Sequence, residues 1–133
     1  PDNKNFAKLC KKNSICFVQL IAPTTTLKRM KEIIKNSHEM IYMISTISTT
    51  GSALKYSIKK IINNYNIIKR IKPSKNVVIG FGITEKTISN LRSADGLVVG
   101  SAICREITRS LKDRQNPVTN VSKLVRKLKN KII

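Results

Sequence analysis

The stretch Asp95-Gly-Leu-Val-Val-Gly-Ser-Ala-Ile103 contains a short apolar run that ends abruptly in glycine and serine. An apolar run bounded by turn residues predicts a buried strand, and the residues after Gly100 suit the start of a helix. The same order, an apolar run followed by glycine, occurs one unit earlier in Asn76-Val-Val-Ile-Gly-Phe-Gly82. Two such turns in succession predict repeated strand-to-helix units, with glycines placed where the strands end.

Working outward from these turns, helical and strand patterns alternate along the chain, which implies a parallel sheet with right-handed crossovers. A doubly wound sheet fits the alternation alone. The glycine-rich strand ends favour a (β/α)8 barrel instead, because its last two strand-to-helix loops often bind phosphate. The predicted strands are 15–21, 40–44, 76–79 and 97–99, and Ser45–Ser52 is predicted to be a loop. Three helices are predicted at 2–13, 27–34 and 54–70. Three more are predicted further along the chain: one capped by Thr84 with Glu85 in its first turn, one after Ser101, and one that starts at Pro117.

Three of these strand ends carry small residues, at Thr50-Gly51-Ser52, Gly80-Phe81-Gly82 and Gly100-Ser101. Glycine lets backbone N–H groups approach an anion closely, and a helix that begins after the turn adds a favourable dipole. Ordinary tight turns would explain any one of these glycines, but several spaced sites together favour phosphate binding. The pattern is not a Walker A loop, since no Gly-Lys-Ser/Thr follows, and it lacks the third glycine of a dinucleotide fingerprint.

The formal charge of +19 suggests nucleic-acid binding, but two features of the composition argue against it. The basic residues are spread over the whole chain, and aromatic residues, which would stack on bases, make up only 5% of it. Abundant Ile, Lys and Asn, whose codons are rich in A and T, explain the charge equally well. We therefore expect no specific nucleic-acid partner, although polyanions would be attracted nonspecifically at low salt.

Other classes are also disfavoured by the sequence. No apolar run is long enough to span a membrane, and the start Pro1-Asp-Asn-Lys4 lacks the apolar core of a signal peptide, so a cytoplasmic protein is expected. Cys10, Cys16 and Cys104 show no CxxC spacing, and His38 is the single histidine. We expect no metal site, and reduced, mostly buried thiols.

Five spaced motifs make the sequence recognisable. They are Leu20-Ile-Ala-Pro-Thr-Thr-Thr26, Ile41-Tyr-Met-Ile-Ser45, Thr50-Gly51, Gly80-Phe-Gly-Ile83 and the stretch from Asp95 to Ile103. Together they resemble the tryptophan synthase alpha chain family over nearly the whole chain. The resemblance implies an α/β fold of the TIM (β/α)8-barrel type, with residues 1–133 forming a single partial domain. That domain is the C-terminal half-barrel of four parallel strands with flanking helices, strands five to eight, truncated on its N-terminal side.

The resemblance also implies a lyase of tryptophan biosynthesis that cleaves indole-3-glycerol phosphate to indole and glyceraldehyde 3-phosphate in an aldol-type reaction. Such a chain uses no cofactor of its own. It works in an alpha2beta2 heterotetramer with the tryptophan synthase beta chain, which carries pyridoxal phosphate. By resemblance, the phosphate-binding residues are Gly51, Phe81, Gly82, Gly100 and Ser101. The indole pocket implied by the resemblance is formed by Ile21, Tyr42 and Phe81. Thr50 would lie in the lid loop, where Ser48 stands in place of a usual glycine.

No catalytic residue is assigned, because the catalytic Glu and Asp of the family belong to the region of strand two, which has no counterpart here. The seven acidic residues have structural interpretations. Glu39 and Asp95 are predicted at the amino ends of strands, one residue lies near the chain terminus, and the others are predicted to be charges on helix surfaces. Four strand-helix units cannot close an eight-stranded barrel. The expectations are therefore a truncated or decaying copy, a chain that needs a separate N-terminal half, or a homodimer of halves. The alternative function is a noncatalytic fragment that binds a sugar phosphate or the beta chain without turnover.

Overall fold

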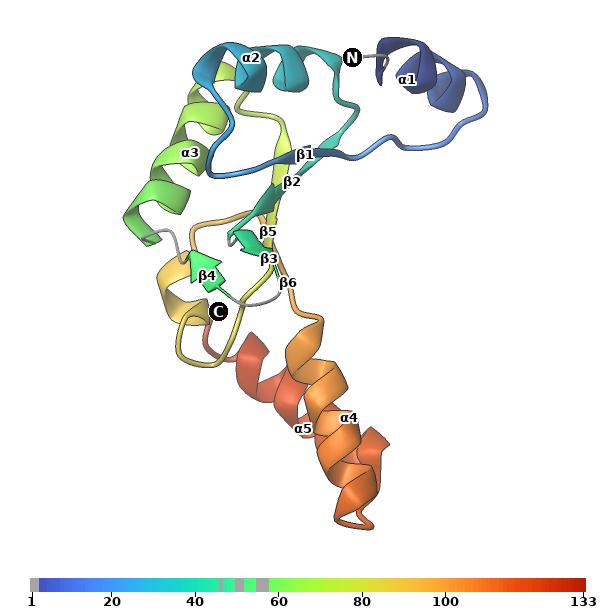
Figure 1. The fold of residues 1–133 in the computed structure, drawn as a ribbon, viewed down its shortest axis with the longest axis vertical. Helices are drawn as coiled ribbons and strands as arrows, with labels where there is room; N and C mark the ends of the chain where they lie inside the picture. Colours follow the sequence, from blue (N-terminus) through green and yellow to red (C-terminus); the bar gives the residue numbers. More distant parts are fainter. Residues whose placement is uncertain (1–2, 46, 50–51, 55–57) are drawn as a thin grey trace.

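Four parallel strands form the central sheet of the computed structural model, which describes residues 3–45, 47–49, 52–54 and 58–133 (Figure 1). Their order across the sheet is β1-β2-β5-β6, so each strand pairs with the one that precedes it in this series. Parallel neighbours need crossover connections, and helices supply them between β1 and β2 and between β2 and β5. The strands are β1 Gln19–Ile21, β2 Met40–Ile44, β5 Asn76–Gly80 and β6 Gly96–Val98.

The two faces of this sheet differ in burial. The register pairs Ile21 with Met43 and Met43 with Ile79, so these side chains share one face. All three are almost fully buried and belong to the hydrophobic core that helices α2 and α3 help to form. The other face carries Leu20 and Tyr42, which are also paired, and Leu20 is 57% exposed. The sheet is therefore covered by helices on one side only.

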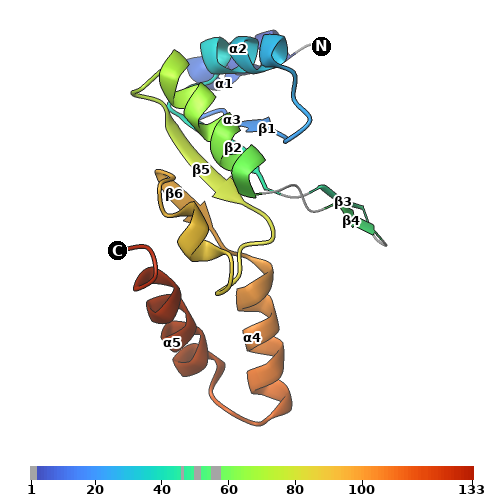
Figure 2. The ribbon, with the colours of Figure 1, turned by 90° about the vertical axis from the view of Figure 1, so that its left-hand side faces the viewer.

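The helices begin where the sequence offers a cap. The Thr26 hydroxyl accepts a hydrogen bond from the Arg29 N–H at 3.3 Å, and the Asn116 carboxamide accepts one from the Val118 N–H at 2.9 Å. Helices α4 and α5 run side by side as a hairpin that extends away from the sheet in both views (Figures 1 and 2). The helices are α1 Asn3–Lys12, α2 Leu27–Asn36, α3 Ile58–Ile71, the 3-10 helix η1 Ile88–Leu91, α4 Ser101–Lys112 and α5 Pro117–Lys129.

The segment expected to be a loop after β2 instead contains an antiparallel hairpin, so that prediction was wrong. Strands β3 Ile47–Thr49 and β4 Ser52–Leu54 pair with each other, with Ile47 opposite Leu54. Polar composition suggested a loop, but β-branched Thr and Ile residues suit a short strand equally well. The pairing also explains why α3 begins at Ile58 and not at Leu54.

Two other elements are shorter than expected. Strand β1 begins at Gln19 and not at Ile15, because the N–H of Ile15 turns back to the Cys10 carbonyl at 2.9 Å. Thr84 does not cap a helix. Its N–H bonds the Thr87 hydroxyl at 3.0 Å within a turn, and only η1 follows. Among the described helices, none combines the length and the apolar content that crossing a bilayer requires.

Candidate functional site

The turns after β5 and β6 leave the sheet at the same edge, at neighbouring positions. Strands β5 and β6 are parallel partners, and Gly80 lies opposite Val98 in the register. The chain therefore leaves both strands at their carboxyl ends, and Gly82 and Ser101 are exposed there. The structure brings together the two glycine-containing turns that the sequence singled out, at the edge where TIM-barrel enzymes place their sites.

The turn after β5 has an unusual backbone. Phe81 has φ of 68° and Gly82 has φ of 66°, the left-handed region that a phenylalanine rarely adopts. The carbonyls of this turn face the protein: the Gly80 carbonyl accepts from the Ser45 N–H at 2.9 Å, and the Phe81 carbonyl accepts from the Ser45 hydroxyl. The Gly82 N–H, by contrast, donates to no group in the part of the chain that the structure describes.

The turn after β6 leads into the amino terminus of α4. Gly100 is the N-cap residue, and its carbonyl accepts from the N–H groups of Ile103 at 2.9 Å and Cys104 at 3.1 Å. The N–H groups of Ser101 and Ala102 come before the first residue that an intrahelical bond can satisfy, so they stay available to an anion. A Cβ added at Gly100 would meet nothing within 4 Å, so the space beside this N-cap residue is open.

Two of the three residues predicted for the indole pocket lie together. The rings of Tyr42 and Phe81 contact each other edge to face, with centroids 6.0 Å apart and an interplanar angle of 82°. Gly80 allows this arrangement, because a Cβ there would overlap the Tyr42 hydroxyl. Both aromatic residues therefore stand beside the candidate phosphate turn, on the uncovered face of the sheet or at its edge.

The third predicted pocket residue, Ile21, lies elsewhere. The register places its side chain on the helix-covered face, opposite to that of Tyr42, and it is fully buried in the core. Its exposed neighbour Leu20 shares the face of Tyr42 but was not among the predicted pocket residues. Alternation along the strand could have indicated that Leu20 and Ile21 point to opposite faces. The predicted site residues Thr50 and Gly51 lie outside the described residues.

The cysteine prediction was wrong for two of three thiols. Cys10 is buried as expected, but Cys16 and Cys104 are exposed and all three are free. Within the described residues, no three side chains of His, Cys, Asp or Glu gather as a metal-binding group.

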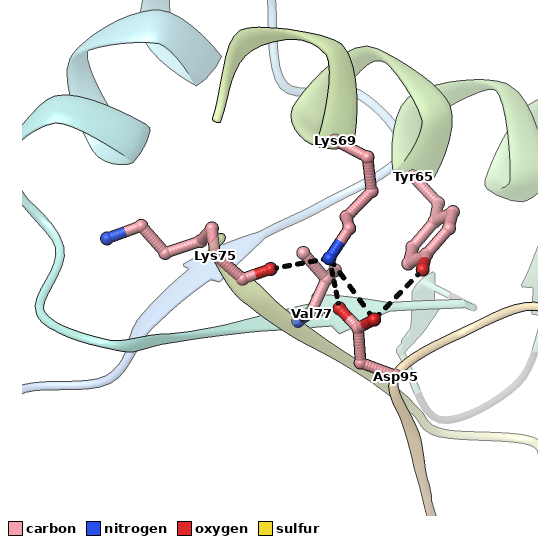
Figure 3. A network of polar contacts seen from close by, with 5 residues as sticks. All are labelled: Tyr65, Lys69, Lys75, Val77 and Asp95. Atoms are coloured by element: carbon pink, nitrogen blue, oxygen red, sulfur yellow. Dashed lines mark hydrogen bonds and ion pairs between the residues drawn. The ribbon is translucent and has the colours of Figure 1, made fainter. Parts of the chain in front are cut away.

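Asp95 lies at the opposite end of the sheet from these turns, where it joins strand, helix and loop (Figure 3). Its carboxylate accepts from the Val77 N–H at 2.8 Å, from the Lys69 ammonium at 3.0 Å and from the Tyr65 hydroxyl at 3.2 Å. Partial burial works against ionisation, but the Val77 and Lys69 contacts outweigh it and hold the pKa of Asp95 below its ordinary value. Burial, followed by the Asp95 charge, raises the pKa of Tyr65. The structural role predicted for Asp95 is supported by these contacts.

The other described carboxylates engage basic groups on the outside or stand away from the site. Glu85 bonds Lys127 of α5 at 2.7 Å, and this contact is the main reason that its pKa is lowered. Of the remaining acids, Glu32 pairs with Arg29, Glu106 pairs with Arg109, Glu39 precedes β2, and Asp113 ends α4. None of the acids in the described ranges is therefore placed to move a proton at the two turns.

His38 and its surroundings also lie at the amino ends of the strands. The imidazole Nδ1 accepts from the Phe17 N–H at 3.0 Å, and the Lys75 ammonium donates to the carbonyls of Ser37, at 3.0 Å, and His38. Burial, then the nearby Lys72, lowers the pKa of Lys75. A hollow of about 300 Å³ beside His38 is bordered by lysines of α1 and α2. Two of these lysines, Lys11 and Lys35, lie in the last turns of α1 and α2, where a positive charge offsets the helix dipole, so they have a structural explanation.

Comparison with solved structures places this fold in a known class. The chain superimposes on tryptophan synthase subunit alpha from Legionella pneumophila with a TM-score of 0.77 and 21% identity, covering 98% of this chain and 47% of that one. It also matches a tryptophan synthase chain from M. tuberculosis in its aminoacrylate-bound form, with a TM-score of 0.75 and 17% identity over 99% of this chain and 46% of the other. The fold is thus a part of a TIM barrel with four parallel strands and flanking helices, as predicted.

Sequence comparison gives the family. The family model described as tryptophan synthase alpha chain matches residues 1–133. A tryptophan synthase alpha chain from Pelagibacter ubique is 63% identical over 132 residues, which are 99% of this chain and 50% of the relative. One from Aquifex aeolicus is 37% identical over 124 residues, 90% of this chain and 44% of the relative. The chain belongs to the tryptophan synthase alpha chain family and spans about half the length of the relatives that it matches.

Proposed function

We propose that this chain provides the phosphate-binding and indole-binding walls of a tryptophan synthase alpha-type lyase, which cleaves indole-3-glycerol phosphate to indole and glyceraldehyde 3-phosphate. The observation that carries the proposal is the shared position of two turns. The free N–H of Gly82 and the first N–H groups of α4 lie just after the carboxyl ends of two adjacent strands, β5 and β6. Backbone amides and a helix dipole are the groups that bind a phosphate without a metal ion.

We propose a second task for the aromatic pair, which is to bind the indole ring. Tyr42 and Phe81 form an apolar surface beside the phosphate turn, and Phe81 is 57% exposed. A planar indole ring that rests on this surface would be held at a fixed distance from its phosphate, because Phe81 and Gly82 are consecutive residues. Holding both ends of the substrate orients the bond to be broken, and orientation is a large part of the barrier to such a reaction.

The acid and base of the cleavage would come from residues outside this chain. The described carboxylates pair with other groups or stand away from the two turns, so proton transfer at the indole ring and at the glycerol hydroxyl needs groups that these residues do not supply. We further propose that the complete protein acts with a tryptophan synthase beta chain, to which indole passes and which holds pyridoxal phosphate.

The test is an assay of indole release from indole-3-glycerol phosphate. The chain alone should release no indole, and the chain mixed with the N-terminal half of the Pelagibacter ubique relative should release it. Omitting either half serves as the control. Failure of the wild-type chain to bind glycerol 3-phosphate, together with an inactive mixture, would refute the proposal.

One alternative is favoured by a specific observation, the engagement of the described carboxylates away from the two turns. It is a noncatalytic chain that binds a sugar phosphate or the beta chain without turnover. Glycerol 3-phosphate binding in a mixture that releases no indole would favour this alternative.

A further inference from the structure

We propose that Ser45 is a positioning residue for the phosphate turn, a role that rests on the function proposed above. Ser45 is the first residue after β2, and it is 5% exposed. Its N–H donates to the Gly80 carbonyl at 2.9 Å and its hydroxyl donates to the Phe81 carbonyl. One residue on the neighbouring strand therefore holds two consecutive carbonyls of the turn.

Because the peptide group is planar, fixing a carbonyl also fixes the direction of the N–H of the next residue. In a trans peptide the carbonyl of one residue and the N–H of the next lie in one plane and point in opposite directions. The structure contains no cis peptide bond among the described residues. Because the Ser45 hydroxyl binds the Phe81 carbonyl, the Gly82 N–H must point away from Ser45. The serine thus aims the amide that the phosphate needs, without contacting the phosphate itself.

The backbone at Phe81 shows why such a hold is required. A side chain with a Cβ disfavours the left-handed region, so φ of 68° at Phe81 persists only if neighbouring groups enforce it. The Ser45 N–H holds the Gly80 carbonyl and so fixes the peptide that sets φ of Phe81. The Ser45 hydroxyl fixes the next peptide, whose rotation would change the positive φ of Gly82 and turn the Gly82 N–H out of the site.

A second hydroxyl lies near the turn but is a weaker candidate. The Thr87 hydroxyl is 3.4 Å from the Gly82 carbonyl and equally far from the Thr84 carbonyl, at the long limit for an O–H···O bond. Thr87 is also bonded by the Thr84 N–H at 3.0 Å, which engages it in its own turn. Ser45 is buried and fixed to a strand, so it is the group that sets the peptide plane.

The experiment compares Ser45→Ala with wild type in the complete 133-residue chain. Affinity for glycerol 3-phosphate is measured by calorimetry, and the φ of Gly82 is followed by backbone chemical shifts and couplings without ligand. The expected result is about a tenfold loss of affinity, the effect of one hydrogen bond, together with loss of the positive-φ signature at Gly82. Ser45→Thr, which keeps the hydroxyl, should restore both.

Ser110→Ala is the matched control. Ser110, like Ser45, is buried, and its hydroxyl also donates to a backbone carbonyl, that of Glu106 at 2.8 Å, but it lies between α4 and α5. A general loss of stability would appear in both alanine variants, whereas loss of affinity should appear only in Ser45→Ala. If Ser45→Ala does not fold, Ser45→Cys, similar in size and a weak donor, takes its place.

The outcomes separate the two proposals. If wild type binds glycerol 3-phosphate and Ser45→Ala binds it equally well, the role of Ser45 is refuted and the proposed function stands. If wild type does not bind, the proposed function fails, and the φ of Gly82 in the variant still decides whether Ser45 sets the turn. Retention of positive φ at Gly82 in Ser45→Ala would overturn the inference in either case.

Discussion

The two ends of the parallel sheet use the same kinds of backbone groups in opposite ways. At the amino end, charged side chains form hydrogen bonds to backbone groups. The Asp95 carboxylate accepts from the Val77 N–H, and the Lys75 ammonium donates to the carbonyls of Ser37 and His38. At the carboxyl end, the protein holds carbonyls and leaves amides free, at Gly82 and at the start of α4. The amino end is thus internally bonded, whereas the carboxyl end leaves N–H donors open, as the proposed anion site requires.

The comparison shows that an available donor is informative only when its neighbours are satisfied. A buried polar group without a partner is costly, so proteins leave few of them. The free amides of the carboxyl end lie at the surface beside carbonyls that are firmly bonded. An unpaired N–H in that setting indicates a ligand site more strongly than the presence of glycine does.

The largest expected effect is at the amino end, for Asp95→Asn. Loss of the charge weakens the bonds from Val77, Lys69 and Tyr65, and hydrogen bonds to a charged group are worth about 1.5–3 kcal/mol each, so the variant should be less stable by about that amount. Urea denaturation measures it, with the exposed Asp113→Asn as the control. Glycerol 3-phosphate affinity should not change. A loss of affinity in Asp95→Asn would contradict the assignment of stability to the amino end and of ligand binding to the carboxyl end.

The same residue gives a pH dependence. Because the folded-state pKa of Asp95 is lowered, its contribution is complete above the carboxyl pKa of the unfolded chain, about 4, and is lost as the pH falls through the lower folded-state value. The difference in stability between wild type and Asp95→Asn should therefore shrink as the solution is acidified. A difference that stays constant to the lowest pH would contradict this assignment.

A smaller effect is expected for Gly82→Ala. Its φ of 66° costs an L-residue about 1–2 kcal/mol, so the variant should lose stability by roughly that amount. Gly100→Ala is the matched control, because its φ is −115° and the space around its Cβ position is open. Thermal or urea denaturation of both variants is the measurement. Equal losses at the two positions would mean that the turn after β5 does not have this backbone.

Ser101→Ala should alter binding and not stability. Its exposed hydroxyl is a donor at the first position of α4, and a hydrogen bond to a charged ligand is worth about 1.5 kcal/mol at the low end. Calorimetry should show about a tenfold weaker affinity for glycerol 3-phosphate. Thr108→Ala, whose hydroxyl donates to the Cys104 carbonyl of its own helix at 3.1 Å, should bind as wild type does.

The smallest effect is expected for Glu85→Gln. Glu85 links the turn after β5 to Lys127 and Lys131 of the C-terminal segment, but all three side chains are at least one-third exposed. Exposed ion pairs are screened by solvent and contribute little to stability, so the small loss measured by urea denaturation should diminish in salt. A loss that persists undiminished at high salt would show that this contact does more than join two surfaces.

Some of this structure could be predicted from the sequence, and some could not. The apolar runs at 40–44 and 76–79 revealed two central strands, because a short apolar run bounded by turn residues indicates a strand. The hairpin of β3 and β4 was missed, since its residues are polar and its pairing is with itself. Local pattern therefore identified the buried sheet better than the surface elements.

The site shows the same limit more sharply. The glycines at the strand ends were visible in the sequence, and the structure places their turns side by side. Ser45 was not visible as a site residue, because its role depends on a contact with Phe81, 36 positions further along the chain. Ile21 was placed with Tyr42 by resemblance, whereas the strand register sets them on opposite faces. Long-range contacts and register decide such details, and neither leaves a mark on local composition.

An NMR titration of the wild-type chain with glycerol 3-phosphate at moderate salt tests the central claim most directly. The amide signals of Gly82 and Ser101 should shift together and saturate at one shared dissociation constant, while that of Val77 stays unchanged. Shifts that are spread over lysine-rich surfaces at both ends, without saturation, and that vanish as salt is raised would contradict a built anion site and leave only the attraction of a strongly basic chain.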